Sequence, residues 1–598
     1  MVYLLGASVY AILAFRNFSS VDVVATLLLF SALPLGLIFF ASLQSGDAIH
    51  APHRNSILLA ILVAPLIFFI QFSGISKWKS YFTNFANHRM GAEGGFHQDS
   101  VFHVAIIQGV LNTGRPTTGQ HLEPWVSYHT LSHYIDAAAL FLLRLDPWES
   151  YALLFFAKGV TISLAIIYFS MKVAQGRADS LFWITLLIVF PAFTATWHVI
   201  GSHGQWFPML ALALLSHRVF VIVAKERHSW REFLFLTLLV VIFSAGKVST
   251  GFSFALIVGL WLFFRRPFDL RVVGVGAVWV GFLGLYSLVF SARVSTKLDP
   301  SGLLNLFHSS GREIFALISI AIIIVVVSRV AGSKYGVALS GAVIVSLPVT
   351  AGAVIAVTDN PSDVFYFFHG LFSTTLLLSV AFVASALFSS ENQTAPGERA
   401  PVYLVKLLAF AGALLFAFSP VSSKAELSPY SDVGAIWGIA SSVNGHTYHW
   451  FNQGAGPGER MSTWQAFRND PLQVAGGNGR PWPSQFRDTL HEFTGAQTFS
   501  EESPVLFLTS EQFDFVADQM SAPLPWATGL AVTAVTGMPL VFGVLDSNIP
   551  SYGFSDYGKD AGALSEGSVT EELLCSLNRP VIVVDAIDDF NFSMRCFS

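Results

Sequence analysis

The chain has 598 residues, of which 53% are hydrophobic and only 12% are charged, and its mean hydropathy is +0.59. Soluble proteins carry about 25% charged residues, so this composition excludes an ordinary soluble protein and predicts an integral membrane protein. The formal net charge of −5 comes without a basic stripe, which argues against nucleic-acid binding.

Apolar segments predict a polytopic α-helical membrane domain over residues 1–419. A helix needs roughly 20 apolar residues to cross the hydrocarbon core of a bilayer. About thirteen segments fit this rule, of which the first and seventh are short: 2–15, 22–43, 55–73, 151–171, 180–199, 205–223, 231–246, 248–264, 271–290, 313–329, 336–357, 364–388 and 402–419. The first segment lacks a basic region before it, so we expect no cleavable signal peptide.

Lys and Arg in the short loops predict the orientation of these spans. With the N-terminus inside, the basic residues fall mainly on cytoplasmic loops, as the positive-inside rule requires, and Arg16 is the one local exception. This orientation places residues 74–150, a large outer loop, and residues 420–598 outside the cytoplasm.

The large outer loop contains the motif GGFHQDSVFHVAIIQGVLNTGRP, residues 94–116. Its apolar residues recur at helical spacing from Val101 to Leu111, which predicts a helix. Asp99 precedes this pattern and His103 follows four residues later, so the two side chains can share one helical face. Asp99 therefore has two interpretations, as a helix N-cap or as a functional acid.

Histidines are concentrated in the same loop. Five of the chain's 17 histidines lie between residues 94 and 136. His129 and His133 are four residues apart, a spacing that fits a common helical face or metal ligation. The glutamate of the zinc motif HExxH is missing, so the pattern favours a pair that lines a polar cleft over a catalytic metal site.

A second polar cluster interrupts the apolar sequence at SAGKVSTG, which contains Lys247, Ser249 and Thr250. A lysine within an apolar helix is costly unless it serves a cavity or a partner. The neighbouring Gly, Ser and Thr suit a broken helix end, whose free N–H groups can bind an anion. The alternative is that Lys247 snorkels to the outer interface.

Other outer loops add candidate residues. Arg293 joins Lys247 and Ser249 as a candidate ligand of a phosphate. The candidate substrate-binding residues are His129, His133, His198, His203, Asp363 and His369. Cations and acids on one side of the membrane suit a reaction of an anionic lipid at the outer leaflet.

The composition changes after residue 420, where Pro, Gly, Ser, Asp and Glu become more frequent. Three runs predict buried strands, PVLFLT, PLVFGVL and PVIVVDA, and the segments EQFDFVADQM, PWATGLAVTAVTG and VTEELLCSL predict helices. Their alternation predicts a small parallel α/β domain that serves as a recognition or lid module. Cys575 and Cys596 can pair in an oxidising compartment, and two free thiols are the alternative.

The sequence resembles the GT-C superfamily of polytopic glycosyltransferases. The resemblance rests on QDSVFHVAIIQGVLNTGRP in a large first outer loop, many spans with short loops, and an α/β outer tail. The segment PWATGLAVTAVTGMPLVFG also looks like outer-domain segments of bacterial members. Members often carry two adjacent acids in the first outer loop, whereas Gln98 precedes Asp99 here.

The resemblance implies an inverting transfer of a sugar from a polyprenyl phosphate or pyrophosphate carrier to an acceptor glycan or lipid. Asp99, with His103 near it, takes the role of the acid that acts as base toward the acceptor. No cofactor is required, although a divalent metal is possible in the family, and a bacterial inner membrane is the expected location. The alternative is a transporter or flippase for a lipid-linked or anionic solute; such proteins often show internal repeats, and none is visible here.

Overall fold

The structure is a computed structural model. It describes residues 98–119, 130–174, 204–290, 301–330, 333–357, 361–388, 482–496, 504–519, 526–541, 570–577 and 579–596. These residues fall into two compact units: unit 1 lies within Ile75–Ala157 and Val443–Ser598, and unit 2 lies within Lys158–Ser442. Helix α7 (Pro147–Ala174) has residues in both units.

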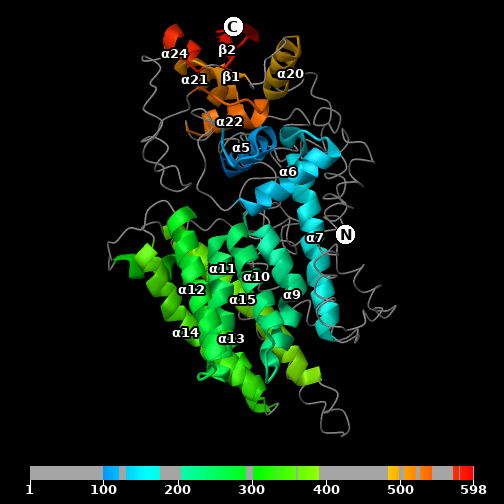
Figure 1. The fold of residues 1–598 in the computed structure, drawn as a ribbon, viewed down its shortest axis with the longest axis vertical. Coiled ribbons are helices and arrows are strands. Elements are labelled where there is room, and N and C mark those ends of the chain that lie inside the picture. Colours follow the sequence, from blue (N-terminus) through cyan, green and yellow to red (C-terminus); the bar gives the residue numbers. More distant parts are fainter. Residues whose placement is uncertain are drawn as a thin grey trace, which may run out of the picture. The chain divides into compact units, whose positions relative to one another are not determined.

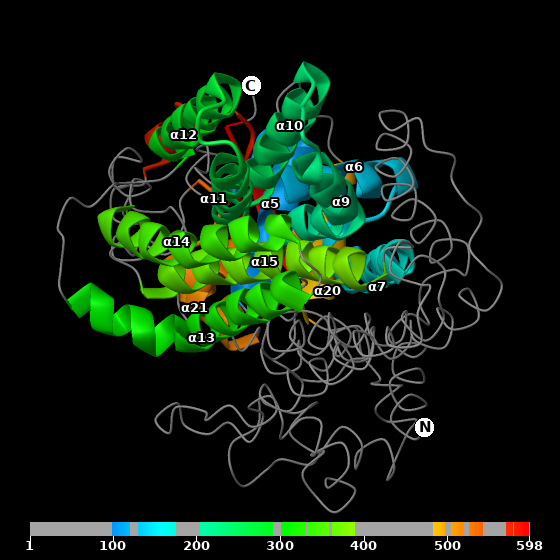
Figure 2. The same cartoon turned by 90° about the horizontal axis from the view of Figure 1, so that it is seen from below.

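Unit 2 is α-helical throughout its described part (Figure 1). Besides the end of α7, it contains α9 (Trp206–Ala224), α10 (Trp230–Gly246), α11 (Val248–Arg265), α12 (Leu270–Phe290), α13 (Ser301–Val330), α14 (Lys334–Val357) and α15 (Pro361–Phe388). Helix α15 packs against α9, α11, α13 and α14, and Figure 2 shows it in the middle of these helices. Its apolar length is therefore almost completely buried.

Four of the described helices contain segments that are long and apolar enough to cross a membrane: Trp206–Ala224, Val248–Arg265, Lys334–Val354 and Tyr366–Ala386. Every predicted span that falls on described residues coincides with a helix. The predicted spans at 2–15, 22–43, 55–73, 180–199 and 402–419 lie outside the described residues, so the number of thirteen stays a prediction. Helix α13 begins twelve residues before the span predicted to start at residue 313. A hydropathy rule detects only the apolar part of a helix, and the first turns of α13 are more polar.

Unit 1 combines helices with a small sheet. The first part of its sequence forms α5 (Gln98–Thr113), α6 (Leu131–Leu143) and the start of α7. The later part forms α20 (Trp482–Gly495), β1 (Val505–Phe507), α21 (Ser510–Gln519), α22 (Trp526–Thr536), α24 (Glu571–Cys575), β2 (Val581–Ala586) and β3 (Asn591–Arg595). The strand order is β1-β2-β3, in which β1 is parallel to β2 and β2 is antiparallel to β3.

The sheet confirms two of the three predicted strands and changes the predicted topology. PVLFLT and PVIVVDA contain β1 and β2, whereas PLVFGVL contributes one isolated parallel bridge, from Leu540 to Leu506, within the described residues. The antiparallel β3 was not predicted, because only Phe592 of its five residues is buried and such a short strand shows no alternation. The layer is therefore mixed and not purely parallel.

Cysteine pairing closes the end of the chain onto α24. Cys575, the last residue of this helix, and Cys596, which follows β3, form a disulfide with a Cα–Cα distance of 4.8 Å. The structure thus contains the pair that the sequence analysis expected.

Helix α5 packs against α22, so the segment that contains Gln98–Thr113 and the C-terminal segment share unit 1 (Figure 1). The amide of Gln108 donates to the carbonyl of Ala534, and the amide of Asn112 donates to that of Gly537. Gly537 has a φ of +69°, a conformation that favours glycine. Backbone carbonyls at the end of α22 are in this way capped by side chains of α5.

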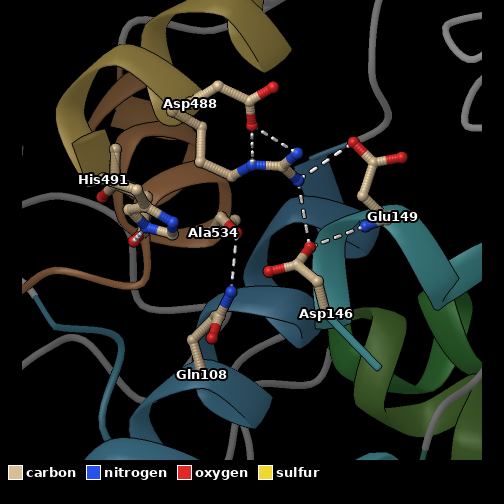
Figure 3. Close-up of polar contacts among 8 residues, drawn as sticks. Gln108, Asp146, Glu149, Asp488, His491 and Ala534 are labelled. Atoms are coloured by element: carbon tan, nitrogen blue, oxygen red, sulfur yellow. Dashed lines mark hydrogen bonds and ion pairs between the residues drawn. The ribbon is translucent and has the colours of Figure 1, made fainter. Parts of the chain in front are cut away.

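Arg487 of α20 joins the later part of unit 1 to the start of α7. Its Nη1 lies 3.2 Å from Asp146 Oδ1 and 2.9 Å from Glu149 Oε1, and its Nη2 lies 2.8 Å from Asp488 Oδ1 (Figure 3). Asp146 Oδ1 also accepts a hydrogen bond from the backbone N–H of Glu149. Burial raises the pKa of Asp146, although this hydrogen bond and the Arg487 guanidinium act in the opposite direction.

We expect Arg487→Met to loosen unit 1. The side chain of Arg487 is only 11% exposed, and removal of one partner of a partly buried ion-pair network costs about 2 kcal/mol. Hydrogen exchange of residues 482–496 should then become roughly 30-fold faster. Arg595→Met is the matched control, because the Arg595–Glu571 pair is 3.7 Å apart and its side chains are 49% and 73% exposed. Equal exchange in the two variants would show that the Arg487 network does not stabilise the unit.

Candidate functional site

Lys247 lies at a break between two helices of unit 2. Its backbone is extended, with φ −158° and ψ 121°, and it both ends α10 and begins α11. Its N–H donates to the Phe243 carbonyl, while its own carbonyl accepts from the N–H groups of Thr250 and Gly251. The broken helix end that the sequence indicated is therefore present.

The Lys247 side chain is buried beneath α15. The residue is 5% exposed, and its Nζ lies 3.4 Å from the centroid of the Tyr366 ring. A cation over an aromatic face recovers part of the free energy lost when the charge leaves water. The ammonium group is therefore enclosed within the described helices, and its role as an anion ligand or a snorkelling residue stays a prediction.

Close packing holds α15 against the first turn of α11. A Cβ at Gly370 would lie 3.0 Å from Ser253 Oγ and 3.1 Å from the Ser249 carbonyl oxygen. Ser253 Oγ lies 3.2 Å from the Phe367 carbonyl, to which it donates. His369, next to Gly370, is fully buried.

Two hydroxyl groups at the start of α11 are buried without hydrogen-bond partners among the described residues. Ser249 and Thr250 are 2% and 0% exposed, and neither Oγ nor Oγ1 has a partner. Other serines in these helices donate to the carbonyl four residues earlier, as Ser244 does to Val240. Two available donors, the positive end of a helix and a buried ammonium group make the start of α11 suitable for an anion.

The start of α9 contacts the same break. A Cβ at Gly246 would lie 2.3 Å from Cγ of Pro208 and 3.3 Å from the Gly204 carbonyl oxygen. Only glycine therefore allows the last turn of α10 to approach the first turn of α9. Gln205, the N-cap residue of α9, is 0% exposed, makes no capping bond, and its amide N and O both lack partners among the described residues.

A second buried lysine lies at the start of α9. Lys158 of α7 is 1% exposed, and its Nζ lies 5.2 Å from the centroid of the Trp206 ring. Sequence reasoning missed Lys158, Gln205 and Tyr366. A signal for Lys158 was available, because a lysine inside a predicted span at 151–171 marks a functional position by default.

In unit 1, the predicted helix of the outer loop is α5. The described part of α5 begins at Gln98, so Asp99 lies within its first turn and not before it. The chemical role of Asp99 stays a prediction.

His103 of α5 is paired with His133 of α6. Nδ1 of His103 lies 3.0 Å from Nε2 of His133, and the residues are 4% and 0% exposed. One of these nitrogens must carry the proton that the other accepts. Asp136, one turn after His133, is also fully buried. The sequence had grouped His103 with Asp99 and His133 with His129, whereas the contact between the two helices joins His103 to His133.

The remaining candidate residues are not placed as side chains. His129, His198, His203 and Arg293 lie outside the described residues, and Asp363 is described only as part of the first turn of α15. Within the described ranges, no three His, Cys, Asp or Glu side chains form a group that could hold a metal ion.

We expect Gly246→Ala to disturb the break at Lys247. The added methyl group would overlap the Pro208 ring, and overpacking of this kind costs about 1–3 kcal/mol. Gly276→Ala on α12 is the matched control, because nothing lies within 4 Å of the added Cβ and alanine favours a helix over glycine by up to about 1 kcal/mol. Thermal unfolding of the purified variants should therefore shift in opposite directions. A Gly246→Ala protein as stable as the wild type would contradict the packing described here.

Comparison with known proteins assigns the chain to no family: no protein-family model matches it, and no curated protein is significantly similar to it in sequence.

Proposed function

We propose that the protein is a membrane glycosyltransferase that moves a sugar from a polyprenyl-phosphate-linked donor to an acceptor glycan or lipid. The observation that carries this proposal is the anion-binding arrangement at the start of α11. There, buried Lys247 is the N-cap residue, and the hydroxyl groups of Ser249 and Thr250 in the first turn are buried without partners among the described residues.

The donor side of the reaction requires a cationic site. When the bond between the anomeric carbon and the phosphate oxygen breaks, the electron pair stays on that oxygen. Charge-assisted donors that are already in place stabilise this developing charge. Lys247 and the first turn of α11 supply such donors in a site sheltered from water, and Arg293 is a further candidate outside the described residues.

The acceptor side requires a base. The acceptor hydroxyl attacks the anomeric carbon, a new C–O bond forms, and a carboxylate within hydrogen-bond reach takes the proton. We assign this role to Asp99 at the start of α5. His103 lies one turn later on the same helix, and its contact with His133 fixes the α5–α6 pair around it. A single base suffices for inversion.

Charge distribution and cysteine chemistry support a reaction on the outer side of a bacterial inner membrane. Apolar helices suit a lipid bilayer, and the Lys and Arg pattern assigns residues 74–150 and 420–598 to the outer side. The Cys575–Cys596 disulfide agrees with this assignment, since structural disulfides persist in oxidising compartments. Assembly of a cell-envelope glycan is the process that such a location favours.

A transporter or flippase for an anionic lipid or solute is the second candidate. The observation in its favour is a set of buried hydroxyls along α15. Thr374, Thr375 and Ser379 are at most 5% exposed and have no partners among the described residues. Polar groups in the middle of a span often mark a pathway for ions or substrates.

Sugar transfer by the wild-type protein distinguishes a glycosyltransferase from a transporter, and the variant Asp99→Asn tests the assigned base. Asparagine has the size of aspartate and can still cap a helix, but it accepts no proton, so sugar transfer should fall by a factor of about 10²–10⁴. Asp585→Asn, at an exposed position of β2, is the control and should transfer normally. The measurement is transfer of labelled sugar from a polyprenyl-linked donor in membranes. Undiminished transfer by Asp99→Asn would show that Asp99 is not the base.

Substitution of Lys247 tests the donor site. Lys247→Met keeps the apolar stem but loses a charge-assisted contact worth about 1.5–3 kcal/mol, so a polyprenyl-phosphate analogue should bind roughly 10- to 150-fold more weakly. Lys247→Arg should retain part of the affinity, because the charge survives with a changed geometry. The control is Lys172→Met, since Lys172 also lies over a tyrosine, with its Nζ 5.9 Å from the Tyr168 ring centroid. Unchanged affinity in a folded Lys247→Met protein would exclude this site.

A further inference from the structure

We infer that the donor site takes a diphosphate: Lys247 and the start of α11 hold one phosphate, while Lys158, Gln205 and the start of α9 hold the other. This inference rests on the proposed function, because it specifies the phosphate group of the same donor.

Two helix starts lie side by side in unit 2. Glycine at position 246 lets α10 reach the Gly204 carbonyl and the Pro208 ring, as shown by the distances from its hypothetical Cβ. Gln205 follows Gly204, and Lys247 follows Gly246, so the N-cap residues of α9 and α11 are each one residue from this contact. Their side chains make no capping bonds. The positive ends of both helices thus face one region of the unit.

Gln205 points to a ligand at the start of α9. Both polar atoms of its amide are fully buried and lack partners among the described residues. An unsatisfied buried polar group destabilises the fold, so native proteins rarely keep one without a partner. An anion at this helix start would accept hydrogen bonds from the amide nitrogen, and a sugar hydroxyl could donate to the amide oxygen.

Lys158 supplies the second positive charge. The Trp206 ring holds its ammonium group at the start of α9, in the same way that Tyr366 holds that of Lys247. Both lysines are at least 95% buried. A sugar linked to a polyprenol through one phosphate carries one negative charge, whereas a diphosphate linkage carries two. Two buried lysines at two adjacent helix starts therefore suit a ligand with two phosphate groups.

The test compares four probes with the purified full-length chain: inorganic phosphate, inorganic pyrophosphate, a polyprenyl monophosphate and the polyprenyl diphosphate of the same length. The wild type should bind each diphosphate at least about tenfold more tightly than its monophosphate counterpart, the gain expected from one further charge-assisted contact. Lys158→Met and Gln205→Leu should remove this preference, because they weaken binding of the diphosphate probes more than binding of the monophosphate probes. Lys247→Met should weaken the binding of the monophosphate and the diphosphate probes, whereas Lys172→Met should weaken neither.

Equal affinities of the wild type for the monophosphate and diphosphate probes would overturn the inference, and this comparison needs no variant. Loss of both affinities in a folded Lys158→Met protein would also overturn it, and Lys158→Arg should restore part of the preference. If the protein transfers sugar only from a monophosphate-linked donor, the proposed glycosyltransferase function stands and the inferred diphosphate donor is wrong. If the protein prefers pyrophosphate to phosphate but transfers no sugar, the inferred diphosphate site stands and the proposed transferase function is wrong.

Discussion

The arrangement of unit 2 depends on the cost of burying a positive charge. The ammonium group of Lys247 is removed from water inside a set of apolar helices, where an uncompensated ion is strongly destabilising. The surrounding structure offsets part of this cost locally. The Lys247 Nζ lies 3.4 Å from the centroid of the Tyr366 ring, and the Lys247 backbone lies at a break between two helices. Gly246 and Gly370 bring α9 and α15 into contact with that break.

Unit 1 is organised by polar contacts between segments that are more than 300 residues apart. Arg487 reaches Asp146 and Glu149, while Gln108 and Asn112 bond to carbonyls near the end of α22. Through these contacts the C-terminal segment supports α5, the helix that carries Asp99 and His103. The placement of α5, and with it the backbone of Asp99, therefore depends on residues far away in the sequence.

Hydrophobic length and spacing predicted many of the helices well, because both properties are local. The spans at 205–223 and 248–264 coincide closely with α9 and α11, and Val101 to Leu111 lie within α5. The sequence also predicted the helix break at Lys247, because a charged residue followed by Ser and Thr interrupts an apolar span. The signal failed at β3, which is too short to show a pattern, and at Lys158, whose charge was overlooked inside an apolar run.

By itself, the sequence determined the class of the protein, the apolar helices, the outline of the C-terminal sheet and the residue types available for chemistry. The tertiary structure alone decided which of these residues meet. His103 contacts His133 across two helices, Lys247 lies beneath Tyr366 more than one hundred residues later, and Gln205 lies one residue from the Gly204–Gly246 contact. The physical reason is that composition and periodicity report the environment of a segment, whereas pairing depends on the approach of helices whose distance is set by small residues and close packing.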